Sequence, residues 1–124
     1  MLGSKPRSFI DANVLLYLAT DEDAKATVAE QLLGTGGTVS VQTLNEIANV
    51  MRRKFRLPWE PVLELIERLR SLLAIVPVTT EVHTEGLRLA QRYQLSVFDS
   101  MIVAAALEAG CTVLYSEDMH NGLV

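Results

Sequence analysis

The sequence has little cysteine, few aromatic residues and no long apolar run. Its single cysteine, Cys111, excludes an internal disulfide framework and indicates a reducing compartment. No segment approaches the roughly 20 consecutive apolar residues that a membrane-spanning helix requires. Residues 1–7 are polar, and no apolar signal segment follows them. We therefore expect a cytoplasmic protein with no membrane partner.

The remaining composition is typical of a globular protein. The chain has 124 residues, of which 49% are hydrophobic and 21% are charged. This is enough apolar material for one hydrophobic core, and too short a chain for two domains. The sequence contains no internal repeat, low-complexity tract or linker. We expect residues 1–124 to form a single domain.

The net charge of −4 argues at first against nucleic acid as a partner, because phosphate binding favours basic surfaces. Acidic residues that hold divalent cations would reverse part of this charge, so the sum decides little. Four cations share one short segment: Arg52, Arg53, Lys54 and Arg56. They are candidates for contacts with RNA phosphates. The alternative is a solvated helix end, because cations also favour helix C-termini.

Short β-branched or apolar segments alternate with segments of helical periodicity. We expect strands at residues 8–10, 38–41, 74–78 and 112–115. Helices are expected at about 14–18, 21–33, 44–55, 61–73, 80–93 and 98–109. Pro77 indicates that the third strand lies at an edge of the sheet, and the almost wholly apolar helix 98–109 is expected to be buried. Strands that alternate with helices predict a parallel α/β sheet covered on both faces.

Four acidic residues are expected at the carboxyl edge of this sheet, where open α/β sheets bind ligands. Asp11 directly follows the first strand, and Glu46 lies in the first turns of the helix after the second. Asp99 begins the helix that leads into the fourth strand, and Asp118 follows that strand by a few residues. Their convergence on one edge, more than any single residue, indicates a site.

Carboxylates that lie close together repel, and each raises its neighbours' pKa unless a cation neutralises them. No lysine or arginine lies immediately beside Asp11, Asp99 or Asp118 in the sequence. A hard divalent ion is the simplest solution, and carboxylates with water suit Mg²⁺ or Mn²⁺. Such ions activate water for phosphodiester hydrolysis. The pattern therefore predicts a metal-dependent nuclease.

Each acid also has an ordinary structural interpretation. Asp11 is a favoured N-cap residue for the helix that follows it, and Glu46 has the position of a solvated glutamate. Ser96 and Asp99 fit a capping box. However, Asp99 shares a helical face with apolar residues, where an ionised acid without a partner is costly. We therefore favour a functional role for Asp99, since capping and metal binding are compatible.

Other residues give weaker signals. His83 and His120 are far apart in the sequence and have no second ligand at metal spacing, so a zinc site is not expected. Cys111 is interpreted as a small buried hydrophobic residue. Trp59, which follows a proline at a helix start, is expected to pack in the core or at an interface.

Four segments together resemble the PIN domain, and more narrowly the VapC-type toxins of bacterial toxin–antitoxin pairs. They are residues 9–15 (Phe-Ile-Asp-Ala-Asn-Val-Leu), 44–46 (Leu-Asn-Glu), 98–106 (Phe-Asp-Ser-Met-Ile-Val-Ala-Ala-Ala) and 115–119 (Tyr-Ser-Glu-Asp-Met). The resemblance extends from about residue 8 to the end of the sequence. It implies a three-layer α/β/α sandwich with a mainly parallel sheet of four to five strands. It also implies an Mg²⁺- or Mn²⁺-dependent endoribonuclease that forms homodimers and is bound by a cognate antitoxin.

The resemblance assigns roles residue by residue. Asp11, Glu46, Asp99 and Asp118 match the four acids of the family in order, and Glu117 is an equally acidic rival of Asp118. We expect Asp11, Asp99 and Asp118 to be the main metal ligands. Glu46 is expected to bind the metal directly or through water and to help position the nucleophile. Asn13 and Ser116 match supporting polar positions near the first acid and the metal.

One feature departs from the family pattern. Members usually continue into a final short strand, often with an Asn-Pro-Phe-like end, whereas this sequence stops at Val124. We expect either a truncated chain or a domain that lacks this edge strand, and an uncovered edge would be a pairing site.

Two other functions stay open at this point. The first is a phosphatase or phosphotransferase with Asp11 as nucleophile. It would favour an Asp two residues later, where Asn13 stands, or a lysine near a later strand end, and no lysine follows Lys54. The second is a non-catalytic domain that binds RNA or protein. Loss of Mn²⁺-dependent cleavage in Asp99→Asn, with the fold intact, would separate the nuclease from both.

Overall fold

The computed structural model describes residues 8–20 and 23–116. Four short strands form one sheet in the order β3-β2-β1-β4, and every neighbouring pair is parallel. The strands are β1 (Ser8–Ile10), β2 (Thr38–Ser40), β3 (Ala74–Val76) and β4 (Val113–Tyr115). The helices are α1 (Ala12–Leu15), the 3-10 helix η1 (Leu16–Ala19), α2 (Asp23–Thr35), α3 (Val41–Arg53), α4 (Trp59–Leu72), α5 (Thr80–Tyr93) and α6 (Val97–Glu108).

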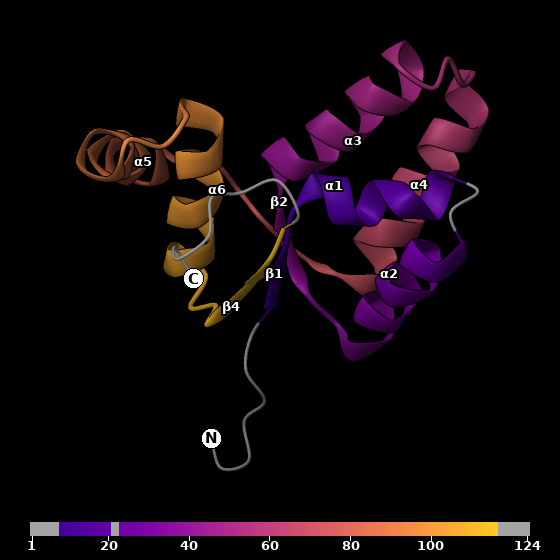
Figure 1. Cartoon of the computed structure of the whole chain (residues 1–124), viewed down its shortest axis with the longest axis horizontal. Helices are drawn as coiled ribbons and strands as arrows, with labels where there is room; N and C mark the ends of the chain where they lie inside the picture. Colours follow the sequence, from indigo (N-terminus) through magenta and orange to yellow (C-terminus); the bar gives the residue numbers. More distant parts are fainter. Residues whose placement is uncertain (1–7, 21–22, 117–124) are drawn as a thin grey trace.

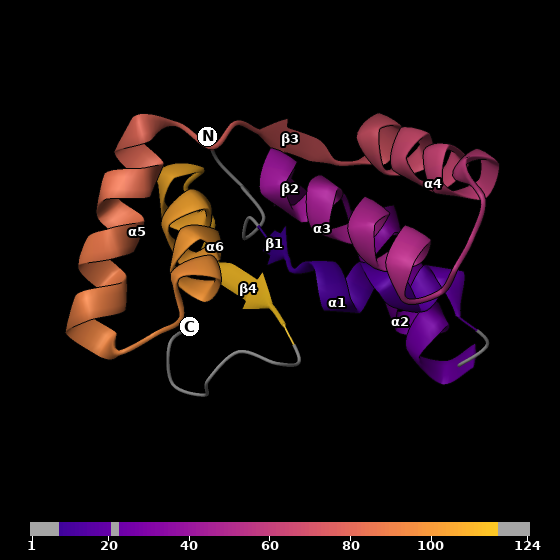
Figure 2. The same ribbon diagram turned by 90° about the horizontal axis from the view of Figure 1, so that it is seen from above.

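The helices cover both faces of the sheet, as the alternation of strands and helices predicts. Figure 1 shows α1 to α4 on one side of the strands and α5 with α6 on the other. The view from above in Figure 2 shows the same three layers. The predicted α/β/α arrangement with a parallel sheet is therefore confirmed. Among the described residues, no helix combines the length and apolar character needed to cross a membrane.

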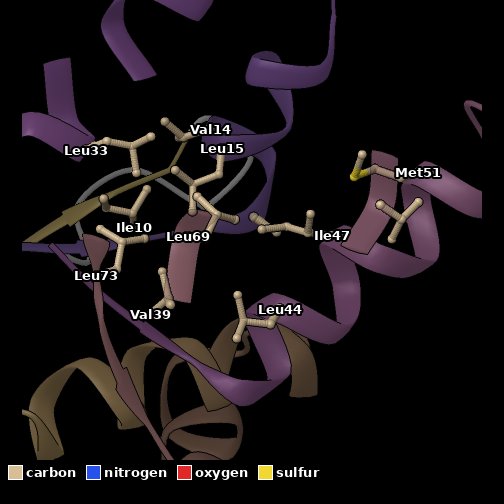
Figure 3. Packing of buried hydrophobic residues seen from close by; sticks show 12 residues of the cluster. Ile10, Val14, Leu15, Leu33, Val39, Leu44, Ile47, Met51, Leu69 and Leu73 are labelled. Atoms are coloured by element: carbon tan, nitrogen blue, oxygen red, sulfur yellow. The ribbon is translucent and has the colours of Figure 1, made fainter. Parts of the chain in front are cut away.

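Each face of the sheet has its own hydrophobic core. The aliphatic core lies under α1 to α4 and contains Ile10, Ala12, Val14, Leu15, Leu33, Val39, Leu44, Ile47, Met51, Val62, Leu69 and Leu73. Figure 3 shows Ile10 of β1, Leu33 of α2 and Leu69 of α4 within this packed group. The alanine-rich core lies under α5 and α6 and contains Phe9, Val82, Leu89, Ile102, Ala104, Ala105 and Ala106. β1 serves both cores, because successive side chains point to opposite faces of a strand.

Most elements begin and end near their expected positions. β3 lies at an edge of the sheet, as Pro77 predicts, because proline cannot donate to a strand ladder. Val41 was expected in the second strand but begins α3, since the Ser40 hydroxyl caps the helix there. The residues expected as one helix at 14–18 form a single α-turn followed by η1.

Two burial predictions need correction. Helix α6 is not buried all round, because Val97, Phe98 and Leu107 are 49%, 70% and 58% exposed. Trp59, expected in the core or at an interface, lies outside the core: it is 56% exposed, and the Arg52 guanidinium lies over its ring. Cys111 is only partly buried and packs at the margin of the alanine-rich core. Apolar character in the sequence predicts helix and core in general, but it does not decide which side chains of a helix stay exposed.

Candidate active site at the carboxyl edge of the sheet

The ends of three strands and the start of one helix meet at a single edge of the sheet. α1 leaves β1 and α3 leaves β2 at this edge, and β4 also ends there (Figure 1). The register pairs Ile10 with Tyr115, and the backbone NH of Asp11 donates to the Tyr115 carbonyl oxygen at 2.9 Å. α6 leads into β4 from the opposite direction, so its first turn lies at the same edge. The expectation that β1, β2 and β4 end, and α6 begins, at one edge of the sheet is therefore confirmed.

Asp11 is a buried acid, 6% exposed, and its carboxylate is held on both oxygens. Oδ1 accepts a hydrogen bond from the backbone NH of Ala12 at 2.7 Å, and Oδ2 accepts one from the Ser116 hydroxyl at 2.9 Å. Asp11 is thus the N-cap of α1, its ordinary interpretation, and it is also fixed from β4 by a residue 105 positions away. Hydrogen bonds of this kind offset part of the desolvation that burial imposes on a charge. They leave the carboxylate in one orientation.

Asn13 lies in α1, two residues after Asp11. Its Oδ1 atom is buried and has no hydrogen-bond partner within the described part of the chain. A buried acceptor without a partner costs about 1–3 kcal/mol, so it calls for an explanation such as a bound ion or water. An oxygen donor of this type suits Mg²⁺ or Mn²⁺, directly or through a water molecule.

Glu46 lies on the exposed face of α3, one turn into the helix. The start of α3 is fixed by a buried capping box: the Ser40 hydroxyl accepts from the backbone NH of Thr43 at 3.2 Å, and the Thr43 hydroxyl accepts from the backbone NH of Ser40 at 3.4 Å. This cap ties the direction of α3 to the end of β2. Glu46 borders a groove of about 340 Å³ whose other lining residues are Gln42, Asn45, Asn49 and Phe98.

Asp99 occupies the first turn of α6. The Ser96 hydroxyl caps the helix and accepts from the backbone NH of Asp99 at 3.1 Å. No hydrogen bond returns from the Asp99 carboxylate to Ser96 within the described residues, so only half of the predicted capping box is present. The carboxylate is partly buried and is not used by the cap. Phe98, its neighbour, borders the same groove as Glu46, which places the start of α6 beside α3.

The structure therefore brings some of the predicted residues together and leaves others outside its described range. Asp11 contacts Ser116 directly, and Glu46 shares a groove with the residue before Asp99. No group of three His, Cys, Asp or Glu side chains spaced to hold a metal ion occurs among residues 8–20 and 23–116. Glu117, Asp118 and His120 lie outside the described residues. The absence of such a group among the described residues therefore does not concern the fourth predicted acid, whether it is Asp118 or Glu117.

The basic segment at the end of α3 divides into two kinds of residue. The Arg52 guanidinium donates to the Leu57 carbonyl oxygen at 3.0 Å and lies 4.6 Å from the centre of the Trp59 ring. It holds the turn between α3 and α4. Arg56 adopts a left-handed backbone conformation with φ of 55° in that turn. Arg53 and Lys54 are exposed at the end of α3. His83 is exposed on α5.

Phe98 is the residue at this edge that sequence reasoning did not single out. It is 70% exposed although the helix around it is almost wholly apolar. The available signal was its position directly before an acid in the first turn of a helix, at an edge already expected to bind a ligand. Its apolar character alone favoured burial, so its exposed position could not be recognised from residue type.

A parallel sheet with helices on both faces and acids at its carboxyl edge defines a class of ligand-binding α/β domain. The family model of the PIN domain matches residues 8–120. The chain belongs to the PIN domain family. None of the curated proteins compared with the chain matches it.

Solved structures with the same fold include toxins of toxin–antitoxin pairs. Mycobacterium tuberculosis VapC20, a sarcin-ricin loop cleaving toxin, is 19% identical with a TM-score of 0.73, over 90% of this chain and 89% of that one. A toxin–antitoxin complex from Klebsiella pneumoniae is 19% identical with a TM-score of 0.66, over 89% and 86% of the two chains. FitAcB from Neisseria gonorrhoeae is 19% identical with a TM-score of 0.65, over 89% and 87%. At these identities the likeness shows the fold.

Proposed function

We propose that this PIN domain is a divalent-metal-dependent endoribonuclease and the toxin of a type II toxin–antitoxin pair. One observation carries the proposal. A buried carboxylate, Asp11, is fixed at the carboxyl edge by Ser116, and two residues further along the chain the buried Oδ1 of Asn13 has no hydrogen-bond partner among residues 8–20 and 23–116. An ordinary N-cap would need neither the second hydrogen bond nor a buried acceptor left unsatisfied.

The donor set at this edge fits Mg²⁺ or Mn²⁺, because it consists of carboxylate, amide and hydroxyl oxygens. The proposed ligands are Asp11, Asp99 and Asp118, with Glu46 binding directly or through water. Such an ion, when bound, activates a water molecule and stabilises charge on a phosphodiester. Glu117 is the rival of Asp118 for the fourth position.

The remaining residues are proposed to position these ligands. The Ser116 hydroxyl orients the Asp11 carboxylate, and the Ser96 hydroxyl caps α6 so that the Asp99 side chain is not used by the helix end. Glu46 is proposed to help position the nucleophile from the exposed face of α3. Supporting contacts of this type affect metal affinity or activity by about 10- to 100-fold.

The biological setting is proposed from the fold relatives. The structure from Klebsiella pneumoniae is named as a toxin–antitoxin complex, and VapC20 is named as a toxin that cleaves the sarcin-ricin loop. We propose that RNA is the substrate, that a cognate antitoxin binds this chain, and that the toxin acts as a homodimer in the cytoplasm. We also propose that residues 1–124 form one domain.

Metal titration of Asp99→Asn tests the nuclease proposal. The Asp99 carboxylate is not used by the Ser96 cap, so asparagine should preserve the fold. Wild type is expected to cleave a 5′-labelled pool of oligoribonucleotides with Mn²⁺ and not with chelator, and Asp99→Asn is expected to lose cleavage. Mn²⁺ should also raise the melting temperature of wild type, because an ion that binds only the folded state stabilises it. That shift should shrink in the variant.

Glu108→Gln is the matched control, since it makes the same chemical change on an exposed residue at the other end of α6. It should cleave RNA and respond to Mn²⁺ as wild type does. Cleavage by Asp99→Asn in the presence of chelator would remove the proposed mechanism.

A further inference from the structure

The exposed face of α3 carries an unusual row of amide side chains. Gln42, Asn45 and Asn49 are spaced three and four residues apart, so they lie along one face of the helix. All three line the groove of about 340 Å³ that also contains Glu46. Amides offer both a donor and an acceptor at fixed geometry, which is the complement of the polar edge of a nucleobase.

Phe98 closes the other side of this groove from α6. At 70% exposure it is the most exposed of the large hydrophobic side chains in the described part of the chain. Burial of a phenylalanine normally stabilises a fold, so an exposed ring at the rim of a groove lined by amide side chains is available for contact with a ligand. Aromatic rings in such positions stack on the bases of single-stranded nucleic acid.

One cation continues the amide row. Arg53 follows Asn49 by four residues and so extends the same face by one turn. Its neighbour Arg52 is already used by the Leu57 carbonyl oxygen and the Trp59 ring, whereas Arg53 is exposed. The four cations of this segment are therefore not equivalent, and the geometry favours Arg53 for contact with a phosphate that follows the groove.

We infer that this groove is a nucleotide-binding subsite for single-stranded RNA. A base stacks on Phe98, the side chains of Gln42, Asn45 and Asn49 read its polar edge, and Arg53 binds a neighbouring phosphate. The inference rests on the proposed function, because it supplies the substrate contacts of that site. Amides beside an aromatic ring favour a nucleotide over a protein helix, which would need an apolar row along α3.

RNA binding in chelator tests the subsite separately from cleavage. Anisotropy of a labelled pool of single-stranded oligoribonucleotides is measured with wild type and with Phe98→Ala. Loss of one stacking contact is expected to weaken binding about 5- to 150-fold. Phe98→Tyr retains the ring and should restore binding to within about twofold of wild type. Tyr93→Ala removes another exposed aromatic side chain of the same layer and should leave binding unchanged.

Two further variants test the amide row and the phosphate contact. Asn45→Ala combined with Asn49→Ala should weaken binding and change which sequences in the pool are preferred. Arg53→Ala should lower the slope of log affinity against log salt by about one, independently of sequence. Arg92→Ala, at an exposed cation of α5 that does not line the groove, is the control and should leave the slope close to that of wild type.

The outcomes separate this inference from the nuclease proposal. Binding that depends on Phe98 supports the subsite even if no Mn²⁺-dependent cleavage is found. With active protein, Phe98→Ala should raise KM more than it lowers kcat, because the contact is made in the ground state as well. Equal affinity of wild type and Phe98→Ala overturns the inference. So does absence of RNA binding by wild type, or a change in oligomeric state as the only effect of Phe98→Ala, which would make this face a protein interface.

Discussion

The two faces of the sheet are packed in different ways. On one face, the aliphatic core is built mainly from leucine, isoleucine and valine contributed by four helices and by the strands beneath them. On the other face, the alanine-rich core has only two helices and three consecutive alanines, Ala104 to Ala106. Large side chains hold helices apart and fill the space between them, whereas small ones let helices approach closely.

Close approach on the alanine-rich side is visible where α5 meets α6. A Cβ atom added to Gly86 would lie 2.6 Å from the sulfur of Met101 and 3.4 Å from its Cα atom. At this point the backbone of α5 at Gly86 therefore packs directly against the Met101 side chain of α6. The aliphatic core should be sensitive to the loss of side-chain volume, and the alanine-rich core to its gain.

The proposed site depends on both layers at once. Asp11 and Glu46 belong to elements on the aliphatic side, while Asp99 and Phe98 belong to α6 on the alanine-rich side. The common sheet holds these two groups of residues at one edge, where Phe98 and Glu46 line the same groove. A change that displaces α6 relative to α3 would alter the groove between them without touching any proposed ligand.

The largest effect is expected for Leu69→Ala in the aliphatic core. Leu69 is fully buried, and its truncation should lower the free energy of unfolding by about 2–5 kcal/mol through lost burial and a cavity. Urea unfolding measures the loss. Leu63→Ala, on the same helix but 58% exposed, should change stability by less than about 0.5 kcal/mol. Similar effects of the two variants would contradict the assignment of this core.

An intermediate effect is expected for Ala105→Leu in the alanine-rich core. Ala105 is 1% exposed, so the larger side chain should lower the free energy of unfolding by about 1–3 kcal/mol through overpacking. Ala24→Leu, at an exposed position of α2, makes the same change without this cost and serves as the control. If Ala105→Leu were as stable as wild type in urea, the proposed contrast between the two cores would be wrong.

The smallest effect concerns the ion pairs at the surfaces of the two layers. Arg88 donates to Glu85 within α5, and this hydrogen bond lowers the pKa of Glu85 below its ordinary value of 4.5. Because the folded-state pKa is depressed, the pair stabilises the fold above pH 4.5, and this contribution is lost as the pH falls through the lowered value. The Glu85 and Arg88 side chains are 40% and 56% exposed, so the effect is small and is screened by salt.

Melting temperatures of wild type and Glu85→Gln should therefore differ slightly at pH 7 and converge as the pH falls below 4.5. Glu30→Gln removes the partner of Arg68, whose guanidinium lies 2.5 Å from Glu30 and joins α2 to α4 across the other layer. Glu30→Gln therefore measures, by the same melting temperatures, the ion pair on the other side of the sheet. A difference for Glu85→Gln that grows on acidification would have the wrong sign.

Much of the fold could be predicted from periodicity and from capping residues. The alternation of β-branched and helical segments gave the parallel sheet, and Pro77 gave the edge position of β3, because both depend on local backbone preferences. The carboxyl edge as the place of Asp11 and Ser116 also follows from chain order, since parallel strands end on one side.

Local preferences could not predict the details of exposure. Phe98 belongs to a helix that was expected to be buried, and Trp59 was expected in the core or at an interface, yet their side chains are 70% and 56% exposed. Such exposure depends on which elements pack around each turn of a helix, and local preferences do not contain this information. Val41 has a high strand preference and still begins α3, because a buried hydroxyl cap at Ser40 outweighs a difference of a few tenths of a kcal/mol in propensity.

The sequence by itself determined the order of strands and helices, the membership of the PIN domain family, and which acids follow strand ends. These properties depend on neighbouring residues and on chain direction. Only the tertiary structure decided that Ser116 holds Asp11, that Asn13 keeps a buried oxygen without a partner within the described residues, and that Phe98 faces the amides of α3. These features depend on residues that are far apart in the chain, and such residues meet only when the helices on both faces of the sheet have packed against it.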